Sequence, residues 1–165
     1  MKIYERIREL SKKYELKNEE KMILGTDGSV TNLLEILFEG DVVVKTIFQK
    51  IVDDTTYRTV ILEVNNIPLV YATSKIPFKN IEYELRENIK RDLLSAEIPI
   101  GRILKMHNLE TRREIIDIDV KGVDEKVRKL LKTDKKLFPQ RTYNIIHNNK
   151  ILMQITEIFN LGEHI

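Results

Sequence analysis

Along the first 40 residues, apolar side chains recur three or four positions apart, the spacing of a helix that buries one face. In residues 2–14 these positions are Ile3, Ile7, Leu10 and Tyr14. In residues 33–38 they are Leu33, Leu34, Leu37 and Phe38. The good N-cap residues Asp27, Ser29 and Thr31 precede the second run. The pattern predicts a helix over 2–14, then a turn at 24–31 that feeds a second helix ending at Gly40.

From residue 41 the pattern changes to alternation, which is typical of strands with one buried face. It predicts a strand over 42–51 that ends at an Asp-Asp pair, and a second strand over 57–64. An Asn-Asn turn at 65–66 then leads into a partner strand over 68–76. Within the second strand, Arg58 falls on the more apolar face, together with Val60 and Leu62.

The second half of the chain mixes helical and alternating patterns. After Pro77 we expect a helix over 81–97, a turn at 99–102 and a short helix over 103–107. Strands are predicted over 114–120, 141–147 and 151–159, with a helix at 123–132 and an Asn-Asn turn at 148–149. This order favours an α+β fold in which helices cover an antiparallel sheet. Because no repeat or linker interrupts the pattern, residues 1–165 are expected to form one domain.

Composition narrows the function classes. The chain has 165 residues, of which 42% are apolar and 33% charged, with a net charge of +2 and no cysteine. The balanced charge gives little attraction for nucleic acid or an anionic membrane. No apolar run approaches the length of a membrane span, and residues 1–10 lack the features of a signal peptide. We therefore expect a cytoplasmic protein without nucleic-acid or membrane partners; its oligomeric state is left open.

The common cofactor and metal motifs are missing from the sequence. There is no GxxxxGK[ST], GxGxxG, GxSxG or HExxH. His107, His147 and His164 are far apart and show no metal-ligand spacing. We therefore predict neither a metal nor an organic cofactor.

Two charged residues in apolar surroundings are candidates for chemistry. A guanidinium at Arg58 is costly to bury without an anionic partner. In the last strand, Glu157 shares a face with Ile151, Met153 and Ile155 if the alternation is regular. Apolar surroundings favour the protonated form of a carboxyl group, which suits a proton donor. The alternative, that both residues pair with surface partners at sheet edges, stays open on pattern alone.

Four segments resemble the chorismate pyruvate-lyase superfamily, especially its branch of short archaeal and actinobacterial proteins. In family order, they are residues 26–35 (TDGSVTNLLE), 57–77 (YRTVILEVNNIPLVYATSKIP), 99–104 (PIGRIL) and 141–159 (RTYNIIHNNKILMQITEIF). At 72–73 the chain has Ala-Thr where better-known bacterial members have Gly-Arg. The final segment is also one residue longer between its turn and Thr156.

The resemblance implies a sheet and helical flaps that enclose an internal ligand cavity. It implies that Arg58 holds the carboxylate of an aromatic product and that Glu157 lies near the product's hydroxyl group. Backbone at Ile100 and Gly101 would close on the ligand, and Val30 would line the cavity. Arg141 would be either a second anion contact or a structural ion pair near the sheet edge.

The implied reaction is the loss of pyruvate and one ring proton from chorismate to give 4-hydroxybenzoate, without a cofactor. Glu157 would act as general acid toward the ether or as base toward the ring proton, with Arg58 as the anchor. Two alternatives remain. The chain could be a lyase acting on a relative of chorismate, or a non-catalytic binder of an aromatic carboxylate like the effector domains of certain bacterial repressors. The roughly 25 residues before the first segment are too few for a winged helix, which disfavours a repressor.

Overall fold

The structure is a computed structural model that describes residues 1–95 and 98–165. Its elements, in chain order, are α1 Ile3–Tyr14, α2 Asn18–Gly25, α3 Val30–Phe38, β1 Val42–Val52, β2 Thr55–Val64, β3 Ile67–Pro77, the 3₁₀ turn η1 Phe78–Asn80, α4 Tyr83–Ser95, α5 Ile100–Met106, β4 Arg112–Gly122, α6 Glu125–Leu130, β5 Leu137–His147 and β6 Lys150–Phe159. The expected end of α4, near Glu97, lies outside the described residues.

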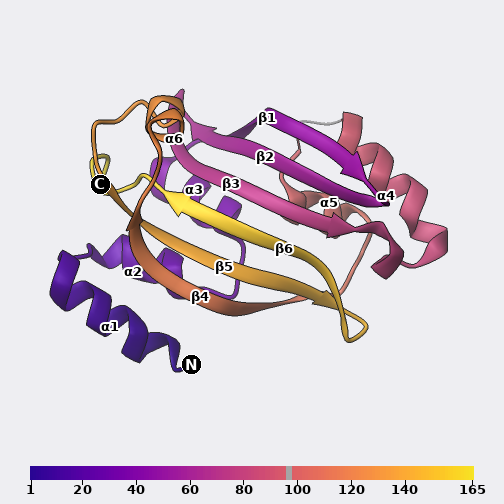
Figure 1. The fold of residues 1–165 in the computed structure, drawn as a ribbon, viewed down its shortest axis with the longest axis horizontal. Helices are drawn as coiled ribbons and strands as arrows, with labels where there is room; N and C mark the ends of the chain where they lie inside the picture. Colours follow the sequence, from indigo (N-terminus) through magenta and orange to yellow (C-terminus); the bar gives the residue numbers. More distant parts are fainter. Residues whose placement is uncertain (96–97) are drawn as a thin grey trace.

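Within these residues, six strands form one antiparallel sheet in the order β1-β2-β3-β6-β5-β4 (Figure 1). The two strands at the centre, β3 and β6, are neighbours although about 80 residues separate them in the chain. Tight turns join the hairpins, and their central residues have positive φ: Asp53, Asp54, Asn65, Asn66, Asn148 and Asn149. Asn and Asp tolerate this conformation better than other side chains, which is why these pairs mark the turns.

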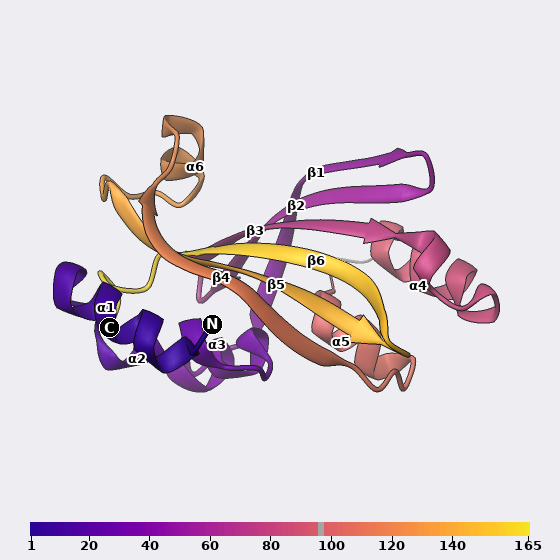
Figure 2. The same ribbon diagram turned by 60° about the horizontal axis from the view of Figure 1, so that its bottom comes forward.

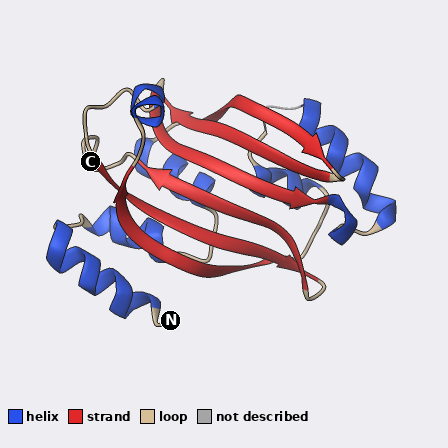
Figure 3. Ribbon diagram, in the orientation of Figure 1, coloured by secondary structure: helices blue, strands red, loops and turns tan. Residues whose placement is uncertain are grey.

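The helices are divided unequally between the two faces of the sheet. Figure 2 shows α1, α2, α3 and α5 on one side and α6 on the other, and Figure 3 shows how the sheet separates them. Val127 and Leu131, from α6 and its end, pack with Ile61 and Ile158 on that second face. The α+β fold and the antiparallel sheet expected from the sequence are confirmed.

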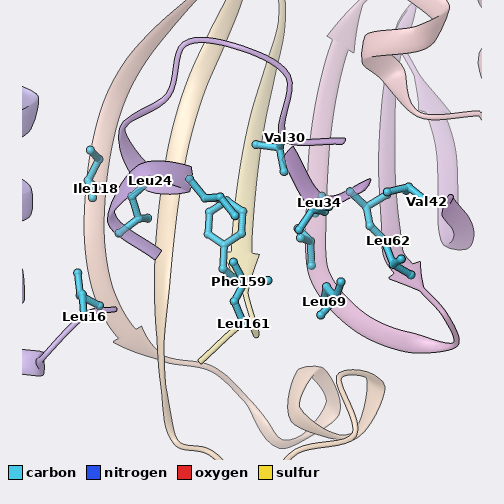
Figure 4. Packing of buried hydrophobic residues seen from close by; sticks show 14 of the residues in the cluster. Leu16, Leu24, Val30, Leu34, Val42, Leu62, Leu69, Ile118, Phe159 and Leu161 are labelled. Carbon is cyan, nitrogen blue, oxygen red and sulfur yellow. The ribbon is translucent and has the colours of Figure 1, made fainter. Parts of the chain in front are cut away.

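Two further apolar clusters pack helices against the sheet. One packs α1, α2 and α3 against the strands and includes Leu24, Leu34 and Phe159 (Figure 4). The other packs α4 and α5 against the opposite end of the sheet and includes Ile89, Ile103 and Leu152. The candidate site lies where these two clusters meet.

Several sequence-based expectations were wrong in detail. Helix α5 begins at Ile100, inside the turn expected at 99–102, and β4 begins at Arg112 instead of residue 114. Helix α2 was not predicted at all. Strand β5 begins at Leu137 instead of residue 141. The last strand does not alternate regularly, because its pairing with β5 shifts between Met153 and Ile151. Ile151 is therefore 46% exposed, whereas Met153 and Ile155 are buried. The shift leaves one extra residue unpaired in β6, as a β-bulge does.

Candidate active site

A small cavity lies between the sheet and the helices that cover it. Its floor is formed by side chains from β2, β3, β5 and β6, and its rim by the start of α3 and the start of α5. The volume open to the centre of a water-sized sphere is about 60 Å³. Most of the lining is apolar, contributed by residues such as Val60, Leu62 and Ile155. Such a space suits one compact, largely apolar ligand.

Arg58 points into this cavity from β2. Its residue is only 3% exposed, and Nε and Nη2 have no hydrogen-bond partner among residues 1–95 and 98–165. Burial lowers the pKa of Arg58 from its ordinary value. A buried guanidinium without an acidic partner is costly for the folded protein. The arrangement therefore provides a planar pair of donors for an anion that enters the cavity.

Glu157 lines the same cavity from β6 and is 4% exposed. Its Oε1 accepts a hydrogen bond from Nε of Arg141 at 2.9 Å, and both side chains are nearly inaccessible to solvent. A charge-assisted bond of this kind fixes the orientation of the carboxylate beside the cavity.

Arg141 lies beside Glu157 but is not part of the cavity wall. Its Nη1 donates to the backbone oxygen of Thr26 at 2.6 Å and to that of Leu24 at 3.5 Å. The side chain thus ties the end of α2 to the strand that carries Glu157. The geometry gives Arg141 the part of a positioning residue within an ion pair, and this pair is deep in the sheet, away from its edge.

The strand registers explain how Arg58 and Glu157 reach one cavity. Ala72 of β3 pairs with Val60 on one side and Glu157 on the other. Arg58 pairs with Ser74, two residues from Ala72 and on the same face. Two strand spacings, roughly 10 Å at about 4.8 Å each, separate the strands of the two charged residues. Between them the cavity is lined by apolar side chains and by the Cβ of Ala72.

The helical rim holds the other residues that the resemblance singled out. Val30 is the first residue of α3, is 5% exposed and lines the cavity (Figure 4). Ile100 and Gly101 open α5 and line the cavity opposite it. Arg102 bonds both carboxylate oxygens of Glu35 at 2.5 Å, and this pair connects α5 to α3 across the rim.

Of the residues with ionisable side chains that line the cavity, two were not recognised in the sequence. Tyr143 of β5 is 4% exposed and lines the cavity, and the guanidinium groups of Arg141 and Arg113 both lie over its ring. Burial, and next the charge of Glu157, raise the pKa of Tyr143, so its phenol stays neutral. Tyr143 lies two residues after Arg141 in an alternating strand, so the pattern could have placed it on the same face. Arg113 was missed because the predicted strand began one residue after it.

Other chemistry finds no support in the residues that the structure describes. Among them, no group of three or more His, Cys, Asp or Glu side chains is placed to hold a metal ion. None of their helices combines the length and the apolar character needed to cross a bilayer.

The fold and the site define a class of protein: an α+β domain with a small cavity between an antiparallel sheet and the helices that cover it. A family model described as "Chorismate pyruvate-lyase Rv2949c-like" matches residues 24–164. The chain belongs to this family. It is also 66% identical, over 96% of its length, to the protein named "Putative lyase MJ0807" from Methanocaldococcus jannaschii, 87% of which is covered. The resemblance stated from the sequence is confirmed.

Solved structures share the fold at low sequence identity. PhnF from Mycobacterium smegmatis aligns with a TM-score of 0.65 and 12% identity, over 96% of this chain and 87% of that one. The effector domain of PhnF aligns with a TM-score of 0.62 and 12% identity, over 83% of this chain and 90% of that domain. YydK from Bacillus subtilis, described as a possible transcriptional regulator, aligns with a TM-score of 0.57 and 13% identity, over 96% of this chain and 93% of that one. At such identities the likeness shows the fold alone.

Proposed function

We propose that the protein is a cytoplasmic, cofactor-independent chorismate pyruvate-lyase that forms 4-hydroxybenzoate and pyruvate. One observation carries the proposal: Arg58, a buried guanidinium for which the described part of the chain offers no acidic partner, shares a small apolar cavity with the buried carboxylate of Glu157. The first group can hold the carboxylate of a ring acid, and the second can act on the far side of the ring. Membership of a chorismate pyruvate-lyase family supports the same substrate.

The proposed reaction is an elimination. Glu157, held in position by its ion pair with Arg141, accepts the proton from the ring carbon that bears the hydroxyl group. The electrons of that C–H bond form the new ring double bond, and the neighbouring bond between the ring and the ether oxygen breaks. The leaving enolate takes up a proton at carbon and becomes pyruvate. Formation of the aromatic ring makes the step downhill, so the protein has mainly to orient the ring and accept a proton.

The cavity supports the reaction in two further ways. Arg58 binds the ring carboxylate with two parallel bonds, which fixes the rotation of the ring relative to Glu157. The apolar walls and the starts of α3 and α5 exclude water and strengthen that attraction. Val30, Ile100 and Gly101 are proposed to contact the ring from the helical rim.

The direct test is to incubate the purified protein with chorismate and to measure 4-hydroxybenzoate by chromatography and pyruvate with a coupled assay. Equal amounts of both products are expected. Glu157→Gln keeps the size of the side chain but removes the base, so turnover should fall at least about a hundredfold while 4-hydroxybenzoate still binds. Glu125→Gln is the matched control, because Glu125 is exposed on the opposite face of the sheet. Full turnover by Glu157→Gln would remove Glu157 from the mechanism.

A second candidate is a binder of an aromatic carboxylate without catalysis. The fold it shares with the effector domain of PhnF favours this alternative. It predicts that the wild-type protein binds 4-hydroxybenzoate and chorismate but converts neither. A lyase acting on a relative of chorismate would bind 4-hydroxybenzoate weakly, and substrate analogues with other ring substituents would separate that case.

A further inference from the structure

A second arginine, Arg113, reaches the cavity from the edge strand β4 at the far end of the strand order from Arg58. Arg113 lies on the edge strand β4 and pairs in register with Ile145 of β5. Its side chain lines the cavity, and its Nε is buried without a hydrogen-bond partner among the described residues. Among the described residues, no carboxylate forms an ion pair with Arg113. Its guanidinium carbon lies 5.8 Å from the ring centre of Tyr143.

Arg113 also stands at the junction between the cavity and an outer cleft. The cleft, of about 960 Å³ by the same measure as the inner cavity, runs beside α5. Both spaces are lined by Ser29, Thr31, Gly101 and Arg113. A Cβ on Gly101 would come within 3.5 Å of Nη2 of Arg113, so the guanidinium lies against the first turn of α5. The side chain therefore borders the passage between the inner and outer spaces.

The charges in the cavity call for a ligand with two negative groups. Arg58 and Arg113 are both cationic, whereas Glu157 is already neutralised by Arg141. The two arginines lie on β2 and β4, with three strands between them, a separation of roughly 19 Å between their backbones at about 4.8 Å per strand pair. Their long side chains point toward one cavity, so their guanidinium groups are closer than that. A monoanion would neutralise one of them, and a dicarboxylate would neutralise both.

We propose that Arg113 binds a second carboxylate of the substrate, the one on the leaving enolpyruvyl group, while Arg58 binds the carboxylate on the ring. This inference rests on the proposed function and deepens it: the site selects cyclic ether dicarboxylates over monocarboxylates. After the ether bond breaks, each product keeps one carboxylate. Pyruvate stays with Arg113 at the junction and leaves through the outer cleft, and the aromatic product stays with Arg58.

A matched pair of ligands tests the assignment without requiring turnover. 4-Methoxybenzoate and 4-(carboxymethoxy)benzoate share the ring carboxylate and the ether, and only the second has another carboxylate. The wild-type protein should bind the dicarboxylate about ten- to a hundredfold more tightly, as measured by titration calorimetry. Arg113→Met keeps the length of the side chain but removes the charge, and it should abolish this preference while leaving the affinity for 4-methoxybenzoate unchanged. Arg113→Lys should restore part of the preference.

Arg112→Met is the control, because Arg112 is the neighbouring residue on β4 and its side chain is 61% exposed. It should keep the full preference. The assignment is overturned if the wild-type protein shows no preference, or if Arg113→Met keeps it. It is also overturned if Arg113→Met weakens both ligands equally, which would mean that Arg113 only supports Tyr143.

Kinetics separate this inference from the proposed function. In Arg113→Met, the KM for chorismate should rise about ten- to a hundredfold while the affinity for 4-hydroxybenzoate stays the same. If the wild-type protein binds neither benzoate and does not convert chorismate, the proposed function fails and this inference fails with it. If chorismate is converted but Arg113→Met leaves its KM unchanged, only the role of Arg113 is refuted.

Discussion

Two buried arginines on the same face of the sheet differ in what surrounds them. Arg58 is 3% exposed and Arg141 is 1% exposed, so both lose nearly all contact with water. Arg141 is paired with Glu157 and bonded to two backbone oxygens. Arg58 has no anionic partner within the described residues and faces a cavity.

This difference shows that the charge of Arg141 serves the fold, whereas the charge of Arg58 is available to a ligand. The Arg141–Glu157 pair balances two buried charges, connects α2 to the sheet and fixes the position of the carboxylate. At Arg58 the burial is not compensated, so the folded protein bears a cost that an incoming carboxylate can offset. If this interpretation is right, removing the two arginines should affect stability and binding in opposite ways.

The largest expected effect is the loss of stability in Arg141→Met. This substitution leaves the carboxylate of Glu157 buried without its partner, and breaking a buried pair in this way costs about 3–5 kcal/mol. The free energy of unfolding in urea, followed by circular dichroism, measures the loss. The double variant Arg141→Met/Glu157→Met removes both charges and should recover most of the stability. A double variant as unstable as the single one would show that packing, and not the unpaired charge, causes the effect.

At Arg58 the effect of the same change on stability should be absent or reversed. Arg58→Met replaces an uncompensated cation by an apolar side chain, so the free energy of unfolding should stay the same or rise by up to about 2 kcal/mol. Binding of 4-hydroxybenzoate should weaken by about ten- to a hundredfold, because a charged hydrogen-bonded contact of about 1.5–3 kcal/mol is lost. Urea unfolding and titration calorimetry on one preparation measure both quantities.

Arg58→Lys sharpens this second prediction. Lysine keeps the charge but cannot donate two parallel bonds to a carboxylate, so the affinity should fall between those of the wild type and Arg58→Met. A loss of stability in Arg58→Met as large as that in Arg141→Met would contradict the comparison, since it would mean that Arg58 is already compensated in the empty protein.

The position of Arg58 can be predicted from the sequence, whereas the pairing of Arg141 with Glu157 cannot. Alternation alone places Arg58 on the apolar face of β2, because side chains of a strand point to opposite faces in turn. The partner of Glu157 was not predictable in this way. Glu157 lies opposite Arg141 only in the register that the Asn-Asn turn at 148–149 and the shift near Met153 set together. A displacement by one residue would have turned one of the two side chains to the other face.

The same limit explains what was missed in the fold. Helix α2 buries only Glu20, Ile23 and Leu24, too few apolar residues to produce a helical pattern. The oxygen of Glu20 accepts a hydrogen bond from the backbone N–H of Lys17, which helps the helix to begin. Its stability therefore comes from tertiary contacts, such as the bond from Arg141 to the backbone oxygen of Thr26 that follows it.

The smallest change in the free energy of unfolding is expected when an ion pair near the surface is removed. Glu35 and Arg102 connect α3 to α5 above the cavity, with side chains 21% and 44% exposed. Such a pair contributes at most about 1 kcal/mol, so Glu35→Gln should destabilise the protein far less than Arg141→Met does. The Arg102 hydrogen bond, the largest cause, lowers the pKa of Glu35 below its ordinary value of 4.5.

The pH dependence gives this prediction its sign. Because the pKa of Glu35 is lower in the folded protein, the stabilisation is present above the ordinary value and is lost as the pH falls through the lowered one. Urea midpoints of the wild type and Glu35→Gln should therefore differ at pH 7 and converge as the pH falls below 4.5. Glu39→Gln is the control, since Glu39 is an exposed residue at the end of the same helix. A difference that persists at acidic pH would assign the effect to helix packing. A difference that vanishes at acidic pH identifies the ion pair as the link that holds α3 and α5 together over the cavity. In that case 4-hydroxybenzoate should dissociate a few times faster from Glu35→Gln than from the wild type at pH 7.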